Sequence, residues 1–181
     1  FCNMYNNVGM DPLPYFNEPP ESPVSTPELA AEYPLVMTTG RRCWEYFHSE
    51  HRQMPRMREF HKWPMFAIHP DDAAAAGIKE GDWAVIENSH GKAMEVAHVT
   101  DTMMKGVISA EHGWWFPERD PEEPSLFGLW ESNINCCTVQ GDFGPSGYGS
   151  SYKTQLAKVY PAPAGYGAEF EKLYQDHFGN R

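Results

Sequence analysis

The sequence has no long apolar run, few basic residues and no paired cysteine motif. Its hydrophobic stretches fall well short of the roughly 20 apolar residues that a membrane-spanning helix requires, so we expect no membrane span in this chain. Lysine and arginine number 14 against 25 acidic residues, which gives a net charge of −11. This acidity argues against general nucleic-acid binding, because phosphate contacts depend on Lys and Arg.

The four cysteines, Cys2, Cys43, Cys136 and Cys137, form no CxxC pair. Their spacing indicates neither a disulfide framework nor a cysteine-ligated zinc or iron–sulfur site. Isolated cysteines usually serve as small apolar fillers in a protein interior. We therefore predict no metal site in this chain.

The first residues contain neither the basic start nor the apolar core of a signal peptide. The chain also begins without an initiator methionine, which predicts a piece cut from a longer polypeptide, with a processed terminus as the alternative. Localisation stays open between the cytoplasm and export together with a parent enzyme.

Three segments are predicted from composition. Residues 1–33 include proline-rich, acidic stretches typical of an extended lead-in from an upstream domain. Residues 34–160 are expected to form the folded domain, and residues 161–181 a C-terminal tail. Large apolar residues recur in the tail at helical spacing, which predicts a short amphipathic helix. They are Phe170, Leu173, Tyr174 and Phe178.

The central segment alternates short apolar stretches with glycine-containing turns. Strands are predicted at residues 35–39, 65–68, 83–87, 94–100, 107–110 and 154–159. Pro70, two acids, four alanines and Gly77 predict one short helix, and a second is predicted within residues 50–61. Short strands with few short helices favour a mainly β fold, a closed β-barrel with helical inserts.

Basic residues gather at residues 41–62, which hold six of the 14 cations and three histidines. On an acidic body, this cluster indicates either a solvated, salt-bridged face or a local anion site.

Several segments, taken in order, resemble those of one known family. They are Thr39-Gly40-Arg41 and residues 47–52, 69–91, 112–118, 132–135 and 149–159. Together they resemble the C-terminal dinucleotide-binding domain of dimethyl sulfoxide reductase-type molybdopterin oxidoreductases. The resemblance covers about residues 10–160, and its specificity comes from the order and spacing of the segments.

The resemblance implies a six-stranded double-psi β-barrel that binds the guanine dinucleotide part of a molybdopterin cofactor. In the parent enzyme the cofactor would be the bis form with molybdenum or tungsten. The metal, its protein ligand and any iron–sulfur cluster would belong to upstream domains of the same polypeptide. The parent would then be an oxidoreductase of the anaerobic dehydrogenase or reductase type, and this chain alone is expected to be inactive.

Twelve residues are predicted to bind the cofactor. They are Thr39, Gly40, Arg41, Arg42, His48, Ser49, Arg52, His112, Trp114, Asn133, Asn135 and Lys153. Gly40 lacks a Cβ and lets the backbone approach a phosphate, and Arg41 or Arg42 can form forked, charge-assisted hydrogen bonds. The alternative for this segment is an ordinary strand-end turn with surface arginines.

The group His48, Ser49 and Arg52 can contact a cofactor through an imidazole, a hydroxyl and a guanidinium. Two alternatives are a metal bound by His48 and His51, and a polar loop that binds nothing. No further ligand stands at a matching spacing, which disfavours the metal.

Asn133 and Asn135 would face the same way on a strand, and amides suit the edges of pterin and guanine. The alternative is a turn, where asparagine is common. Lys153 is predicted to reach a phosphate or pterin oxygen, with a solvated lysine as the alternative.

Trp114 and Trp115 can stack on the cofactor or bury against another domain. We expect residues 113–135 to lie at a cofactor or interdomain surface outside the barrel core, with accessible tryptophans, because irregular aromatic segments usually need a partner surface.

No nucleophile with an ordered base partner is visible, so no catalytic residue is predicted. Three other functions remain. They are a stand-alone small-molecule-binding β-barrel, a hydrolase or metalloenzyme built on the histidine-rich segment, and a parent enzyme that is a non-redox hydratase.

Overall fold

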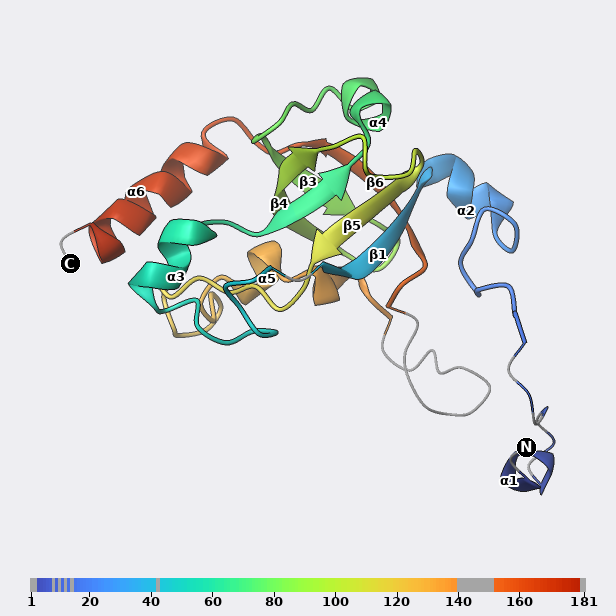
Figure 1. Cartoon of the computed structure of the whole chain (residues 1–181). Coiled ribbons are helices and arrows are strands. Elements are labelled where there is room, and N and C mark those ends of the chain that lie inside the picture. Colours follow the sequence, from blue (N-terminus) through green and yellow to red (C-terminus); the bar gives the residue numbers. More distant parts are fainter. Residues whose placement is uncertain are drawn as a thin grey trace.

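The computed structural model describes residues 3–7, 9, 11, 13, 15–41, 43–139 and 152–179. Its strands close into a barrel with short helices around it (Figure 1). The strands are β1 (Leu35–Arg41), β2 (Met65–Ile68), β3 (Trp83–Glu87), β4 (Lys92–Val99), β5 (Val107–Glu111) and β6 (Gln155–Pro161). The helices are α1 (Asn3–Asn7), α2 (Pro27–Glu32), α3 (Pro55–Phe60), α4 (Pro70–Ala75), α5 (Leu129–Ser132), the 3-10 helix η1 (Ile134–Cys137) and α6 (Tyr166–Phe178).

The strand order around the barrel is β1-β5-β2-β4-β3-β6, and β6 pairs with β1 to close it. β1 is parallel to β5 and β2 is parallel to β4, while the other neighbouring pairs are antiparallel. The predicted closed, six-stranded barrel with short helices is thereby confirmed. The mixed strand order is consistent with the double-psi arrangement.

β1 continues past the predicted end at Thr39 and includes Gly40. The pairing register with β5 shifts between Thr39 and Arg41, and Gly40 has a φ of 117°. A glycine adopts this backbone conformation without the steric cost of a Cβ. The glycine therefore forms a bulge within the strand, where the sequence pattern predicted the strand's end.

Two helices follow their local signals. α4 begins at Pro70, where the His69 ring accepts the N–H of Asp71 at 3.1 Å, and Gly77 follows it with a φ of 70°. α3 is shorter than the predicted range because Pro55 stands in its first turn, where its missing N–H does no harm.

The barrel interior holds a tightly buried apolar core. Met37, Phe66, Ile68, Ile86 and Ile108 come from four different strands, and their side chains are fully buried. The strands' alternation between inward and outward positions explains this convergence.

A second, aromatic core lies outside the barrel and contains Tyr46, Trp114, Phe116 and Phe170. Phe170 belongs to α6, which forms where the apolar spacing predicts a helix and lies on the same side of the barrel as α3 (Figure 1). Trp114 is fully buried, with ring centroids 5.5 Å from Tyr46 and 6.2 Å from Phe116. The predicted accessibility of Trp114 is therefore wrong, because this chain's own aromatic residues cover it.

No helix among the residues that the structure describes has the length and apolar character needed to cross a membrane.

Candidate functional site

Two neighbouring parallel strands bring predicted site residues to one end of the barrel. Thr39 of β1 pairs with Ala110 of β5, and Arg41 pairs with Glu111. Because the strands are parallel, their carboxyl ends point the same way, as the arrowheads in Figure 1 show. Gly40 and His112 therefore leave the barrel at the same end, a common location for ligand sites in sheets with parallel strands.

Lys153 lies against the bulge in β1. The Thr39 hydroxyl donates to the carbonyl of Tyr152 at 2.7 Å, and the Lys153 ammonium donates to the carbonyl of Thr39. A Cβ added at Gly40 would collide with Lys153 Nζ. The structure thus brings Thr39, Gly40 and Lys153 together, and the glycine leaves room for the ammonium group.

A hollow of about 290 Å³ adjoins this group, lined by Asn135, Thr138, Val139 and Tyr152. Tyr152 belongs to both features, so the exposed Asn135 side chain lies in the same region as Lys153.

Asn133 and Asn135 are not on a strand, because this segment forms the 3-10 helix η1. Asn133 caps η1, and its side-chain oxygen accepts the N–H of Asn135 at 3.1 Å. The Asn133 side chain therefore holds the backbone of Asn135, and the two side chains do not lie parallel as they would on a strand.

A second group of predicted residues lies on residues 43–54, which we name the histidine loop. His48 Nδ1 lies 3.0 Å from His112 Nε2, a hydrogen bond in which one ring donates and the other accepts. Trp115 Nε1 donates to the carbonyl of Ser49 at 2.6 Å. Gly113 has a φ of 70°, and a Cβ there would come within 3.3 Å of Ser49. The histidine loop is therefore docked on the chain that leaves β5.

The backbone of this loop is strained at two positions. His48 has a φ of 49° and His51 a φ of 74°, values uncommon for residues other than glycine. Such conformations persist only where the surroundings hold them, and they cluster at ligand sites.

Arg52 provides much of that support from inside the protein. It is 1% exposed, and it donates to the carbonyls of His48, Glu50 (3.0 Å) and His112 (3.5 Å). Its guanidinium carbon lies 4.4 Å from the Tyr46 ring centroid and 5.0 Å from that of Trp114. Burial lowers the pKa of Arg52 from its ordinary value, an effect that the nearby Glu111 opposes.

Arg52 and Trp114 therefore lie in the interior and not on the open face of the barrel end. The prediction that Arg52 or Trp114 contacts a bound cofactor directly is not supported by their burial. Two other residues predicted to bind the cofactor, Arg41 and Arg42, lie partly or wholly outside the described residues. The backbone of Arg41 belongs to β1, but its side chain and the whole of Arg42 are outside the described residues.

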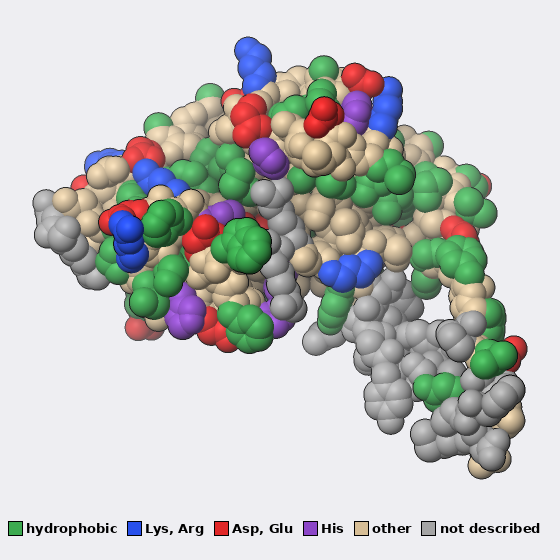
Figure 2. Space-filling view, in the orientation of Figure 1, with side chains coloured by type: hydrophobic (Ala, Val, Ile, Leu, Met, Phe, Trp, Pro, Cys, Tyr) green, Lys and Arg blue, Asp and Glu red, His purple; other side chains and the backbone are tan. Residues whose placement is uncertain are grey.

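Charged and hydrophobic side chains are interspersed on the face of the molecule shown in Figure 2. Figure 2 shows histidine side chains on the lower left part of the molecule, among hydrophobic and acidic ones. Trp44 and Phe47 of the histidine loop are among the exposed large hydrophobic residues. The loop therefore presents aromatic groups to solvent beside the polar groups that face His112.

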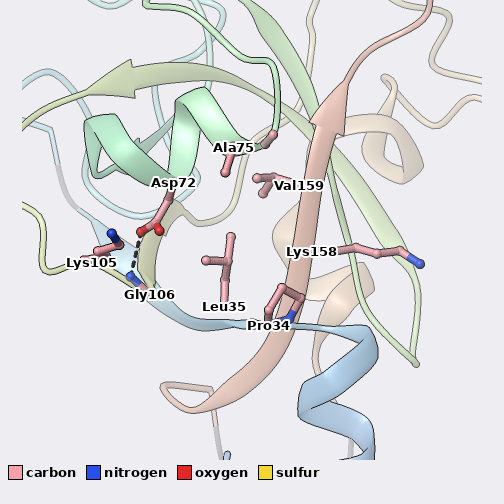
Figure 3. Close-up of a pocket in the computed structure, with 9 residues that line it drawn as sticks. Pro34, Leu35, Asp72, Ala75, Lys105, Gly106, Lys158 and Val159 are labelled. Carbon is pink, nitrogen blue, oxygen red and sulfur yellow. Dashed lines mark hydrogen bonds between the residues drawn. The ribbon is translucent and has the colours of Figure 1, made fainter.

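A further hollow, of about 470 Å³, lies at the amino end of β1 (Figure 3). It lies between Leu35, Ala75 and Val159, and Asp72 at its edge accepts the N–H of Gly106 at 2.6 Å. None of the twelve predicted residues lines it. It is therefore separate from the group at the carboxyl ends of β1 and β5.

The sequence analysis missed a buried acidic network next to the histidine loop. Glu95 and Glu111 are at most 1% exposed, and the N–H of Glu111 donates to Glu95 at 3.1 Å. Glu111 Oε2 lies 2.8 Å from His61 Nε2. Glu95 alternates with the apolar residues Ala93 and Ala97 on one face of β4, and that was the one signal in the sequence for this network.

The fold is a closed mixed β-barrel, with polar side chains of the histidine loop, the β1 bulge and Lys153 beyond the carboxyl ends of β1 and β5. A family model described as "Molydopterin dinucleotide binding domain" matches residues 35–156. The chain belongs to this family of molybdopterin dinucleotide-binding domains.

Curated relatives carry several activities. Dopamine dehydroxylase of Eggerthella lenta is 48% identical over 83% of this chain and 14% of its own length. Acetylene hydratase of Syntrophotalea acetylenica is 33% identical over 66% of this chain and 16% of its own length. Dimethyl sulfoxide/trimethylamine N-oxide reductase of Rhodobacter capsulatus is 38% identical over 54% of this chain and 12% of its own length. The chain thus spans a small fraction of each relative.

Among solved structures, acetylene hydratase from Pelobacter acetylenicus matches with a TM-score of 0.80 at 31% identity. The match covers 87% of this chain and 22% of that chain.

Proposed function

We propose that this chain binds the guanine dinucleotide part of a molybdopterin cofactor, as the C-terminal domain of a larger oxidoreductase of the anaerobic dehydrogenase or reductase type. One observation carries the proposal. In a member of this family, Lys153 contacts the β1 bulge at Gly40 near Asn135, and the histidine loop docks on the chain that leaves the neighbouring strand β5. The bis form of the cofactor, molybdenum or tungsten, and iron–sulfur clusters in upstream domains belong to the same proposal.

The residues present fit a pyrophosphate and flat heterocycles. The Lys153 ammonium has three N–H donors, and Thr39 uses one of them, so donors remain for phosphate or ring oxygens. The missing Cβ of Gly40 lets a ligand approach the backbone. Asn135 offers both an amide donor and a carbonyl acceptor to a pterin or guanine edge.

The chain's part in the reaction is binding and orientation. When bound, the metal–pterin group supplies the redox or oxygen-transfer chemistry. Lys153 neutralises phosphate charge, and the histidine loop, held by Arg52 from inside, keeps His48 and Ser49 in fixed positions. A prearranged binding face reduces the entropy lost when the ligand is ordered.

A second candidate is a hydratase parent that carries out no net redox reaction. The likeness to acetylene hydratase favours it, since that protein matches both in sequence and in structure. The two candidates differ in one measurable respect. A redox parent requires an electron donor or acceptor for turnover, and a hydratase consumes neither in stoichiometric amounts.

Replacing Lys153 with Ala in the whole protein tests the binding proposal. Loss of a charged hydrogen bond is worth about 1.5–3 kcal/mol, so we expect cofactor affinity to fall by about 10- to 100-fold. Released pterin, measured by fluorescence after oxidation, reports the bound cofactor. Lys172→Ala on α6 is the matched control, because it removes an exposed lysine far from β1 in the sequence. Equal cofactor retention in both variants would remove Lys153 from the site.

A further inference from the structure

Three potential metal ligands converge beside the histidine loop. Cys43 and Glu45 belong to the loop, and His61 ends α3. One ligand atom from each residue lies within 4.8 Å of the other two. A thiolate, an imidazole and a carboxylate are the ligand types that Zn²⁺ takes.

The His61 ring is oriented for this role. Its Nε2 lies 2.8 Å from Glu111 Oε2, and that oxygen also accepts the N–H of Met65 at 3.0 Å. A buried carboxylate in this position makes Nε2 the protonated nitrogen, which leaves the lone pair on Nδ1. Metal-binding histidines commonly donate their second ring N–H to a carboxylate in this way.

The distance between His61 Nδ1 and Glu45 suits two ligands of one metal ion better than it suits a hydrogen bond. Nδ1 lies 3.8 Å from Glu45 Oε2, beyond the usual range of about 2.7–3.2 Å for a hydrogen bond. Two ligand atoms on one tetrahedral Zn²⁺ lie about 3.3–3.7 Å apart, given metal–ligand bonds of about 2.0–2.3 Å. The ligand atoms of Cys43, Glu45 and His61 need to approach one another only slightly to reach tetrahedral coordination distances.

The local charge also favours a cation. Glu111 and Glu95 are buried next to the cluster, Glu45 adds a third carboxylate, and Arg52 is a neighbouring cation. Arg58, further along, is already paired with Glu118. A bound dication would offset the carboxylates and hold the sulfur as thiolate.

We propose that Cys43, Glu45 and His61 bind one divalent transition-metal ion of the zinc class, with Glu111 as the residue that orients His61. The ion would join the histidine loop to the end of α3, and a solvent molecule would complete four-coordination. The site uses neither His48 nor His51. It is independent of the cofactor proposal, since its ligands are other residues.

Cobalt provides the direct test on the 181-residue chain. Co²⁺ added to metal-free protein should give a one-to-one titration with a thiolate-to-cobalt charge-transfer band, and Zn²⁺ should displace it. Cys43→Ser should abolish the band. Cys136→Ser, which removes another partly buried thiol outside the cluster, should retain it. Absence of the band in the unsubstituted chain, or its persistence in Cys43→Ser, would overturn the proposal.

Glu111→Gln keeps all three ligands and replaces the carboxylate whose Oε2 accepts from His61 and from the N–H of Met65. We expect zinc affinity to fall by about 10- to 100-fold, the usual effect of losing such a partner. Zinc should also raise the melting temperature of the unsubstituted chain and of Cys136→Ser, but not that of Cys43→Ser. An equal zinc effect on all three proteins would count against the site, even if Cys43→Ser is less stable.

Discussion

Arg58 and Glu118 form a two-point ion pair in which both side chains are fully buried. The two guanidinium nitrogens donate to the two carboxylate oxygens at 3.0 and 2.6 Å. Arg58 also donates to the carbonyls of Arg52 and Lys62. The pair therefore fastens α3 and the end of the histidine loop to the chain beyond β5.

Breaking this pair from one side should destabilise the protein strongly. Arg58→Met leaves Glu118 as a buried, unpaired charge, which costs about 3–5 kcal/mol. Arg58→Met combined with Glu118→Leu should recover much of that loss. Arg56→Met is the control, because Arg56 and Glu59 form an exposed pair worth about 1 kcal/mol or less. Urea unfolding followed by circular dichroism measures all four proteins, and equal losses for Arg58→Met and Arg56→Met would contradict the assignment.

Tryptophan accessibility should follow the structure residue by residue. Trp44 is fully exposed and Trp130 is 62% exposed, whereas Trp114 is buried. Acrylamide is a neutral quencher. The fraction of tryptophan fluorescence that it quenches readily should therefore fall in Trp44→Phe and Trp130→Phe, but not in Trp114→Phe. If Trp114→Phe removes the readily quenched component instead, the aromatic core described for this chain is wrong.

Gly40→Ala should affect cofactor retention more than Gly81→Ala. Both glycines have a positive φ, 117° at Gly40 and 80° at Gly81, so alanine strains the backbone at each position. Only the Cβ at position 40 meets Lys153, while the space around Gly81 is open. We expect a lower pterin content per folded protein in Gly40→Ala than in Gly81→Ala. Equal pterin content in both variants would show that the β1 bulge plays no part in binding.

Acid should weaken the fold partly through Glu87. The Tyr160 hydroxyl and, at 3.3 Å, Lys158 hold the pKa of this carboxyl below its ordinary value of about 4.5. A depressed folded-state pKa contributes stability that is present above pH 4.5 and is lost as the pH falls through the folded-state value. Tyr160→Phe should raise the Glu87 pKa and flatten the stability profile between pH 5 and pH 3. Tyr15→Phe, at an exposed tyrosine, should leave the Glu87 pKa and the pH profile of stability unchanged. Nuclear magnetic resonance titration of Glu87 measures its pKa directly.

The 181-residue chain alone should unfold cooperatively and show no turnover. Its barrel has its own apolar core, which supports independent folding. No nucleophile with an ordered base was predicted from the sequence, and the proposed redox chemistry belongs to the cofactor and to upstream domains. Steady turnover of a sulfoxide, oxyanion or polysulfide by this chain would refute that division of labour.

The sequence predicted the barrel because each strand carries its own local signal. Alternating residues in β4, the turn beside Gly81 and the proline-started α4 are all short-range features, and the structure contains each of them. The bulge at Gly40 was not predictable in the same way, because it depends on the register between β1 and β5.

Burial was the harder part of the candidate site. Arg52 and Trp114 look like surface ligands in the sequence, and only folding shows that they pack on each other. Cys43 and His61 are far apart in the sequence and match no ligand motif, so their convergence was also invisible. Side chains that meet through loops give no periodic signal.

The pairing of β1 with β6 has a consequence for biosynthesis. Leu35 pairs with Ala157, so one edge of the first strand has no partner until the last strand has left the ribosome. During that interval β1 presents unpaired backbone groups, which is a hazard for mispairing in crowded surroundings. Lys153, whose ammonium contacts the carbonyl of Thr39, lies directly before β6 and is synthesised at nearly the same stage. A nascent chain stalled before β6 therefore lacks the closed barrel, so the proposed cofactor binding requires that β6 has been synthesised.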